Sequence, residues 1–306
     1  MNERKTFLSI GECMIEMALM ANGDYRLGFA GDTLNTAWYT RALLPAQSWK
    51  VAYFTRLGSD VYSARLRNFL ETNRITTDLI TMDPVRQPGL YLIDIEKGER
   101  SFTYWRDQSA ARLLADDEDA LERAMDSADI IYFSGITLAI LTPEKRRTFV
   151  GLVAKQRENG KTTVFDPNAR PKLWKSLDFL RSKTMKAAAA ASIVLPSFDD
   201  EATIFGDADI DATAARYLTA GAGLAVVKNG GGDMLVSDGT AQTRIAGHDR
   251  LEPVDTTGAG DSFNGAFLAA IAEGAEVNDA VDRAHAVAAR VVMHRGALMP
   301  MEEIRA

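Results

Sequence analysis

The residues best suited to chemistry lie near the C-terminus, in segment 255–265, which reads DTTGAGDSFNG. Glycines at positions 258 and 260 precede Asp261, and apolar residues then recur at helical spacing. This pattern predicts a loop that leads into a buried helix. The first turn of a helix carries N–H groups without intrahelical partners and a partial positive charge, so it can bind an anion such as a phosphoryl group.

A carboxylate beside such an anion is unfavourable unless it has a function, and Asp261 can have one. It can accept the proton of a hydroxyl group that attacks phosphorus. We expect the helix dipole to keep this carboxylate ionised. The string Gly-x-Gly-Asp alone is also an ordinary way to begin a helix, so these four residues by themselves leave a purely structural role open.

Alternating strands and helices must position this loop. Apolar runs predict strands at 6–10, 51–57, 130–133, 162–165, 192–195 and 224–227. Amphipathic segments predict helices at 61–73, 117–127, 143–159 and 277–294. This alternation is typical of a largely parallel central sheet flanked by helices, in which ligands bind beyond the carboxyl ends of the strands.

Two predicted hairpins interrupt the alternation. One joins segments 12–20 and 25–29, and the other joins 90–95 and 101–105. Because hairpins do not fit easily into a parallel sheet, we expect them to form a small β-rich lid over a site. The predicted organisation is a single α/β domain over residues 1–306, with a lid built from discontinuous segments at about 12–30 and 88–108.

Composition narrows the functional classes. The chain has 306 residues, 46% of them apolar, a net charge of −7 and a pI near 5.2. This acidic balance argues against nucleic acid or an anionic membrane as a partner. It does not exclude an acidic small substrate, because a few local arginines can outweigh a distant charge that salt screens. The single cysteine, Cys13, favours a reducing, cytoplasmic setting, and no apolar run is long enough to suggest a transmembrane helix.

The whole segment 255–265 closely resembles the C-terminal signature of the ribokinase-like (PfkB) family of sugar kinases. Segments 30–37, 166–174 and 196–201 resemble further family motifs, and all occur in the family's order along nearly the whole chain. The resemblance implies a ribokinase-like α/β fold with ATP and Mg²⁺ as cofactors. It also implies that Asp261 is the catalytic base and that the amides of Gly258, Ala259 and Gly260 stabilise the transferred phosphoryl group.

The sugar-binding residues implied by the resemblance point to one branch of the family. Gly-Asp-x-Leu-Asn at 31–35 resembles the 2-keto-3-deoxygluconate kinases, although Ala30 stands where the family has a first glycine. The residues implied to hold the substrate are Gly31, Asp32, Asn35, Tyr91, Tyr104, Arg106, Arg170 and Asp261. Arg106 and Arg170 would converge on a substrate carboxylate, for which the planar guanidinium group is well suited. From the alternation alone, Tyr104 and Arg106 also fit an edge strand with a solvated arginine.

Nucleotide and metal contacts are implied at other strand ends. The implied nucleotide contacts are Asn168, Ser197, Lys228, Gly230, Gly258, Gly260 and His285. Asp166 and Glu201 are the implied magnesium ligands, although Phe198 replaces the asparagine usual in the Glu201 motif. Glu201 could instead be an acidic residue that simply stabilises the start of a helix. The glycine-rich loop after Lys228 could likewise be only the turn of a hairpin.

The predicted function is an ATP-dependent sugar-acid kinase. Its expected reaction converts 2-keto-3-deoxygluconate to 2-keto-3-deoxy-6-phosphogluconate at the 6-hydroxyl. The alternatives are a neutral-sugar kinase of the fructokinase or ribokinase type and a non-catalytic sugar-acid sensor. The expected partners are the sugar acid and ATP, with no nucleic acid and no membrane, and self-association into a homo-oligomer is left open.

Overall fold

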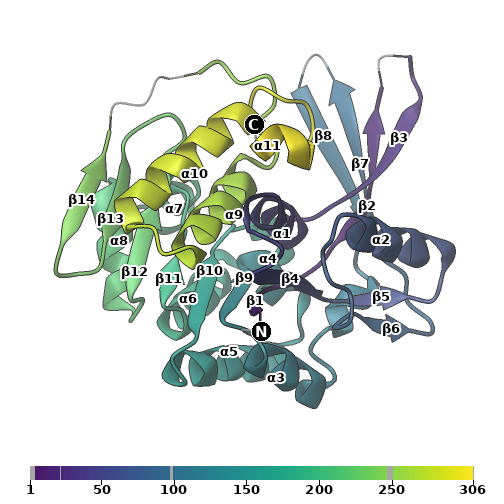
Figure 1. The fold of residues 1–306 in the computed structure, drawn as a ribbon, viewed down its shortest axis with the longest axis horizontal. Helices are drawn as coiled ribbons and strands as arrows, with labels where there is room; N and C mark the ends of the chain where they lie inside the picture. Colours follow the sequence, from purple (N-terminus) through teal and green to yellow (C-terminus); the bar gives the residue numbers. More distant parts are fainter. Residues whose placement is uncertain (1–3, 21, 97–98, 247–250, 306) are drawn as a thin grey trace.

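A computed structural model describes residues 4–20, 22–96, 99–246 and 251–305. Its central feature is an eight-stranded sheet (Figure 1). From one edge to the other, the strands are β14 (Gln242–Ile245), β13 (Met234–Ser237), β12 (Leu224–Val227), β11 (Ile193–Val194), β10 (Thr162–Asp166), β9 (Ile130–Ser134), β1 (Lys5–Ile10) and β4 (Trp49–Phe54). The pairs β12–β13 and β13–β14 are antiparallel and all the others are parallel, which confirms the predicted largely parallel sheet.

Helices cover both faces of the sheet (Figure 1). One face packs against α1 (Asp32–Leu43), α2 (Val61–Thr72), α9 (Ala259–Ala272), α10 (Val277–Val291) and α11 (Met301–Arg305). The other packs against α3 (Glu118–Asp126), α5 (Pro143–Glu158), α6 (Leu177–Ala190) and α8 (Ile210–Thr219). Neighbouring strand residues belong to different cores, as Phe7 and Leu8 of β1 do. Burial on both faces explains why the strands are continuous apolar runs.

The lid is a separate four-stranded sheet in the order β3-β2-β7-β8. Its strands are β2 (Met14–Leu19), β3 (Tyr25–Ala30), β7 (Gly89–Glu96) and β8 (Glu99–Trp105). Figure 1 shows these strands projecting from one end of the molecule, beyond α1 and α2. Both predicted hairpins are confirmed, and the parallel β2–β7 pairing joins them into one sheet. The turn residues Ala21, Lys97 and Gly98 lie outside the described residues.

One predicted strand is wrong in extent. Segment 51–57 is not one strand, because the chain leaves the large sheet after β4. It then forms β5 (Arg56–Gly58), which pairs with β6 (Thr81–Asp83) in a two-stranded sheet. The helices α4 (Gly135–Ile140) and α8 are additional to the predicted ones, and α7 (Phe198–Phe205) has Glu201 in an acidic first turn, as the alternative left open for that residue requires. Within the described residues, no helix is long and apolar enough to cross a membrane.

Close packing of α1 against α9 brings together two segments 226 positions apart in the chain. Gly265 makes this possible, because a Cβ atom there would lie 2.7 Å from the carbonyl oxygen of Thr36 and 2.7 Å from the Cβ atom of Tyr39. Only hydrogen fits in that space. The first turns of α1 and α9 therefore meet near the carboxyl ends of the central parallel strands.

Candidate active site

Asp261 lies in the first turn of α9, directly after the glycine-containing loop. The helix is preceded by Gly258 in the left-handed conformation, with φ 78°. A Cβ atom at position 258 would also lie 2.7 Å from the carbonyl oxygen of Ala297, so both conformation and space require glycine. These constraints explain why a glycine stands immediately before the helix that carries Asp261.

The carboxylate of Asp255 organises the loop. It accepts hydrogen bonds from the N–H groups of Thr257 at 3.0 Å and Gly296 at 2.6 Å. The N–H of Ala259 donates to the carbonyl oxygen of Thr256 at 3.2 Å. Of the three amides predicted to bind a phosphoryl group, that of Ala259 is thus already engaged within the loop. The N–H of Gly260 belongs to the first turn of α9 and has no intrahelical acceptor.

Asn35 links the first turn of α1 to Asp261. Its side-chain amide donates to the Oδ2 atom of Asp261 at 2.8 Å, and its Oδ1 atom accepts from the N–H of Gly31 at 3.3 Å. Glycine is required at position 31, because a Cβ atom there would lie 2.4 Å from the carbonyl oxygen of Glu12. The structure thereby brings the predicted residues Gly31, Asn35 and Asp261 together.

The expectation that the helix dipole keeps Asp261 ionised is wrong. Burial, followed by the negative charge of Asp32, raises the pKa of Asp261 to about 7. The hydrogen bond from Asn35 and the charge of Lys228 oppose this rise, and the charge of Asp166 adds to it. Desolvation and like charges therefore outweigh the dipole here. A carboxyl group with a pKa near neutrality is well suited to exchange a proton with a hydroxyl group.

Asp32 is held by Asn168, which arrives from the segment after β10. The Asn168 amide donates to Asp32 Oδ2 at 2.7 Å. Asn168 adopts φ 31°, in the left-handed region that asparagine tolerates better than most residues. Burial is the main cause that raises the pKa of Asp32, with a smaller contribution from the charge of Asp166. These contacts place a second acid and an amide beside Asp261.

Asp166, at the end of β10, is joined to Lys228, at the end of β12. The Lys228 ammonium group lies 3.3 Å from Asp166 Oδ2 and 3.0 Å from the Oδ1 atom of Asn264. Asn264 also donates to Asp166 at 2.6 Å. A Cβ atom added at Gly260 would lie 3.6 Å from the Lys228 ammonium, so this cation is adjacent to the glycine-containing loop. A phosphate at that loop would meet a buried positive charge.

Asn264 is absent from the sequence prediction. It lies three residues after Asp261, and residues at that spacing share one face of a helix. Its amide connects Asp166 to the Tyr132 hydroxyl, at 2.6 and 3.1 Å respectively. Helical spacing from Asp261 is the signal that could have identified it.

Arg106 stands where the chain returns from the lid to the main body. Its guanidinium group forms a buried ion pair with Glu12, which follows β1 at the start of the lid. The Ser109 hydroxyl donates to the same carboxylate at 2.5 Å. The open alternative of a solvated arginine is excluded, because Arg106 is only 7% exposed. Glu12 is a further site residue missing from the sequence prediction.

Arg170 is more exposed than Arg106 and lies 3.5 Å from the carboxylate of Asp200. The two arginines are related through Tyr104, whose pKa is raised by burial and lowered by the positive charges of Arg106 and then Arg170. Both guanidinium groups thus act on the same hydroxyl group. Their convergence on a substrate carboxylate stays a prediction, since each is paired here with an acid of the chain.

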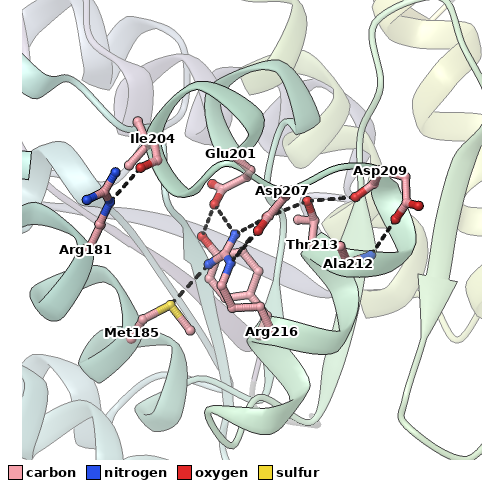
Figure 2. Close-up of polar contacts among 10 residues, drawn as sticks. Arg181, Met185, Glu201, Ile204, Asp207, Asp209, Ala212, Thr213 and Arg216 are labelled. Atoms are coloured by element: carbon pink, nitrogen blue, oxygen red, sulfur yellow. Dashed lines mark hydrogen bonds and ion pairs between the residues drawn. The ribbon is translucent and has the colours of Figure 1, made fainter. Parts of the chain in front are cut away.

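The two predicted metal ligands, Asp166 and Glu201, are held by different cations, Lys228 and Arg216 respectively. Glu201 lies in the first turn of α7 and is fully buried, and its Oε2 atom accepts hydrogen bonds from Arg216 of α8 at 2.7 Å and Tyr217 of α8 at 2.9 Å. Figure 2 shows Arg216 reaching both Glu201 and Asp207. Burial raises the pKa of Glu201 to about 7 despite the charge of Arg216. The Oε2 atom of Glu201 thus joins α7 to α8, and its Oε1 atom is buried without a hydrogen-bond partner among the described residues.

The remaining predicted nucleotide contacts lie around the ends of β11 and β12. Ser197 pairs with Lys228 in an isolated bridge just before α7. Gly230, at φ 53°, lies in the exposed turn that joins β12 to β13, so the hairpin reading of this loop is confirmed. His285 lies half-buried on α10. Phe198 begins α7, and its N–H donates to the Lys228 carbonyl oxygen at 2.8 Å.

The structure explains how Ala30 is accommodated where the family motif has its first glycine. Its methyl group is 2% exposed and packs in a small lid core with Met14, Tyr91 and Ile93. The extra carbon therefore fills space in the lid, and the following residue, Gly31, keeps its contact with Asn35.

The part of the chain that the structure describes contains no cluster of three or more histidine, cysteine or acidic side chains arranged to hold a metal ion. Magnesium is usually held in proteins by one or two carboxylates together with phosphate oxygens and water, and does not need such a cluster. Asp166 fits that pattern, because it lies beside Lys228 and the glycine-containing loop. The site thus combines a titratable acid, a buried cation, a lid, and a helix start of the kind that can bind an anion.

Comparisons with known proteins agree with this arrangement. Residues 4–304 match the model of the pfkB family carbohydrate kinases. A 2-dehydro-3-deoxygluconokinase from Dickeya dadantii (strain 3937) is 36% identical over an alignment of 308 positions, which covers 99% of each chain.

Solved structures share the fold over nearly the full length. A PfkB protein from Polaromonas sp. JS666 superposes with a TM-score of 0.84 at 26% identity, covering 99% of this chain and 100% of that one. A fructokinase from Xylella fastidiosa with bound ATP superposes with a TM-score of 0.82 at 23% identity, covering 99% and 98%.

Proposed function

Because the chain belongs to the pfkB family of carbohydrate kinases, we propose that it transfers the γ-phosphoryl group of ATP to the 6-hydroxyl of 2-keto-3-deoxygluconate. The product is 2-keto-3-deoxy-6-phosphogluconate. The observation that carries the proposal is the position of Asp261, which shares a hydrogen bond with Asn35 of α1 at the start of α9. An acid–base group and an anion-binding helix start occur in one place, as phosphoryl transfer to a hydroxyl requires.

In this mechanism, Asp261 accepts the proton of the 6-hydroxyl as its oxygen attacks phosphorus. Asn35 orients the carboxylate through the bond of 2.8 Å. Lys228 and the N–H of Gly260 stabilise negative charge on the transferred phosphoryl group. Asp166 would hold Mg²⁺, which neutralises charge on the phosphates when it is bound.

The preference for a sugar acid rests on Arg106 and Arg170. Both act electrostatically on the Tyr104 hydroxyl, so a substrate carboxylate near that hydroxyl would interact with two positive charges. A neutral sugar gives these arginines no charge to neutralise. Closure of the lid strands over the bound substrate would exclude water, which could otherwise accept the phosphoryl group.

Replacement of the base tests the proposal. Asp261→Asn should lower kcat with 2-keto-3-deoxygluconate by roughly 10²–10⁴-fold, with little change in ATP binding. Asp279→Asn is a matched control, because Asp279 occupies the corresponding first-turn position of α10 and is exposed. Near-normal turnover by Asp261→Asn would reject the assignment of the base.

A further inference from the structure

One cross-strand row of the lid sheet carries polar groups toward the site. In register, Gly28 of β3 pairs with Glu16 of β2, Glu16 with Tyr91 of β7, and Tyr91 with Tyr104 of β8. Side chains at paired positions lie on the same face of a sheet. Glu16 and Tyr91 are only 8% and 7% exposed, and the ring centroids of Tyr91 and Tyr104 are 5.7 Å apart.

Tyr91 and Tyr104 in this row are surrounded by charges of opposite sign. The pKa of Tyr91 is raised by burial first, then by the charge of Glu16, and among its smaller causes is the charge of Asp261. Burial also raises the pKa of Tyr104, but there the positive charges of Arg106 and Arg170 oppose the rise. The row therefore runs from the catalytic carboxyl group at Tyr91 toward the two arginines at Tyr104.

The Tyr91 hydroxyl donates its hydrogen bond to the Oε2 atom of Glu16 at 2.5 Å, in a buried setting. A tyrosine hydroxyl has one hydrogen atom, and its other hydrogen-bonding capacity is as an acceptor. Because the hydrogen points to Glu16, the side of the oxygen that faces the site can only accept. Glu16 itself has no catalytic or binding role in the mechanism above.

We propose that Glu16 is a positioning residue that fixes the Tyr91 hydroxyl as a hydrogen-bond acceptor and so makes Tyr91 select a donating hydroxyl group of the substrate. This inference rests on the proposed function and adds an orientation rule to it. A carboxylate or keto oxygen at Tyr91 would place acceptor against acceptor and would face the Glu16 charge. The acid end of the substrate is thereby directed to Tyr104 and the arginines, and its hydroxyl end to Asp261.

The test compares 2-keto-3-deoxygluconate with two analogues, in which fluorine replaces either the 4-hydroxyl or the 5-hydroxyl. Fluorine has no hydrogen to donate, so one analogue should leave the Tyr91 acceptor unpaired. Loss of a hydrogen bond that leaves a buried polar group unpaired corresponds to roughly a 10-fold or larger decrease in kcat/KM. We therefore expect wild-type protein to prefer the parent acid over one analogue by that factor.

Variants of Glu16 and Tyr91 test whether their hydrogen bond causes this preference for the parent acid. Tyr91→Phe should abolish the preference, and Glu16→Ala should reduce it to about 3-fold or less, because the freed O–H can turn toward the fluorine. Glu16→Gln should retain the preference, since its amide oxygen still accepts the Tyr91 hydrogen. A matched control is Asp94→Ala, which removes the partner of the exposed Tyr25 hydroxyl, 2.6 Å away in the same sheet. It should leave the preference at the wild-type value.

Two results would overturn the role of Glu16. One is a wild-type preference that persists unchanged in Glu16→Ala, and the other is the absence of any preference at either hydroxyl. If Glu16→Ala does not fold, a preference that survives in Tyr91→Phe contradicts the proposal equally well. Failure of wild-type protein to release ADP with the parent acid would instead reject the proposed function, so the two failures are distinguishable.

Discussion

Replacing Asp261 by asparagine should stabilise the protein, and only at neutral or alkaline pH. In the folded chain the pKa of this carboxyl group is raised from 3.8 to about 7, mainly by burial and by the charge of Asp32. The folded state therefore binds the proton more tightly than the unfolded state does. The stabilisation that the protonated group provides is complete below about pH 4 and is lost as the pH rises to about 7.

The size of the effect follows from the shift. About 3 pKa units correspond to at most about 4 kcal/mol of unfolding free energy, and partial exposure of Asp261 reduces this value. Asparagine keeps the shape of the side chain and can still accept from Asn35, but it never ionises. Asp261→Asn should thus gain up to about 3 kcal/mol more relative to wild type at pH 8 than at pH 5.

Urea unfolding followed by tryptophan fluorescence at pH 5 and pH 8 measures this difference. Glu201, another buried acid with a raised pKa, is present in both proteins and is paired with Arg216 and Tyr217, so its contribution cancels in the comparison. Asp279→Asn, at the same helix position on α10, should show no such pH dependence. A variant that is destabilised equally at both pH values would refute the account of why the Asp261 pKa is raised.

Two further predictions concern the contact between α1 and α9. The acid limb of the pH profile of kcat/KM should have a pKa near 7. Asn35→Ala should raise this pKa by roughly one to two units, because a hydrogen bond to a charged group contributes about 1.5–3 kcal/mol. An acid limb with the same pKa in this variant would contradict the role of Asn35. Gly265→Ala should lower kcat at least roughly 10-fold and destabilise the fold by about 1–3 kcal/mol, because the new methyl group would separate the helices. Gly151→Ala in α5, where a Cβ atom meets nothing within 4 Å, should lower neither quantity, and equal behaviour of the two variants would show that the close approach is unimportant.

The sequence predicts the elements that depend on local pattern. The strand 6–10 and the helix 143–159 appear almost as predicted, because apolar periodicity and the proline at position 143 are local signals. The strand 51–57 is divided because β5 finds a partner in β6, more than twenty residues further along the chain. The residues around segment 51–57 carry no local pattern that could predict the pairing of β5 with β6.

The same contrast between local patterns and long-range contacts applies to the site. Asp261 and its loop are recognisable from eleven consecutive residues, but the pKa of Asp261 depends on Asp32 and Asp166, which come from other segments. Glu16 and Glu12 escaped prediction because their partners, Tyr91 and Arg106, lie 75 and 94 positions away in the chain. The β2–β7 register that pairs Glu16 with Tyr91 is set by the assembled lid and by neither hairpin alone.

The most direct test of the central claim is the rate of ADP release with 2-keto-3-deoxygluconate, fructose and ribose, measured for wild type and Arg170→Ala. Wild type should have its highest kcat/KM with the sugar acid. Arg170→Ala should lower that value by roughly 10–10²-fold, as expected for loss of a hydrogen bond to a carboxylate, and leave any activity on fructose unchanged. Lys172→Ala, an exposed cation two residues away, should behave as wild type. A higher kcat/KM with fructose or ribose than with the sugar acid would contradict the account.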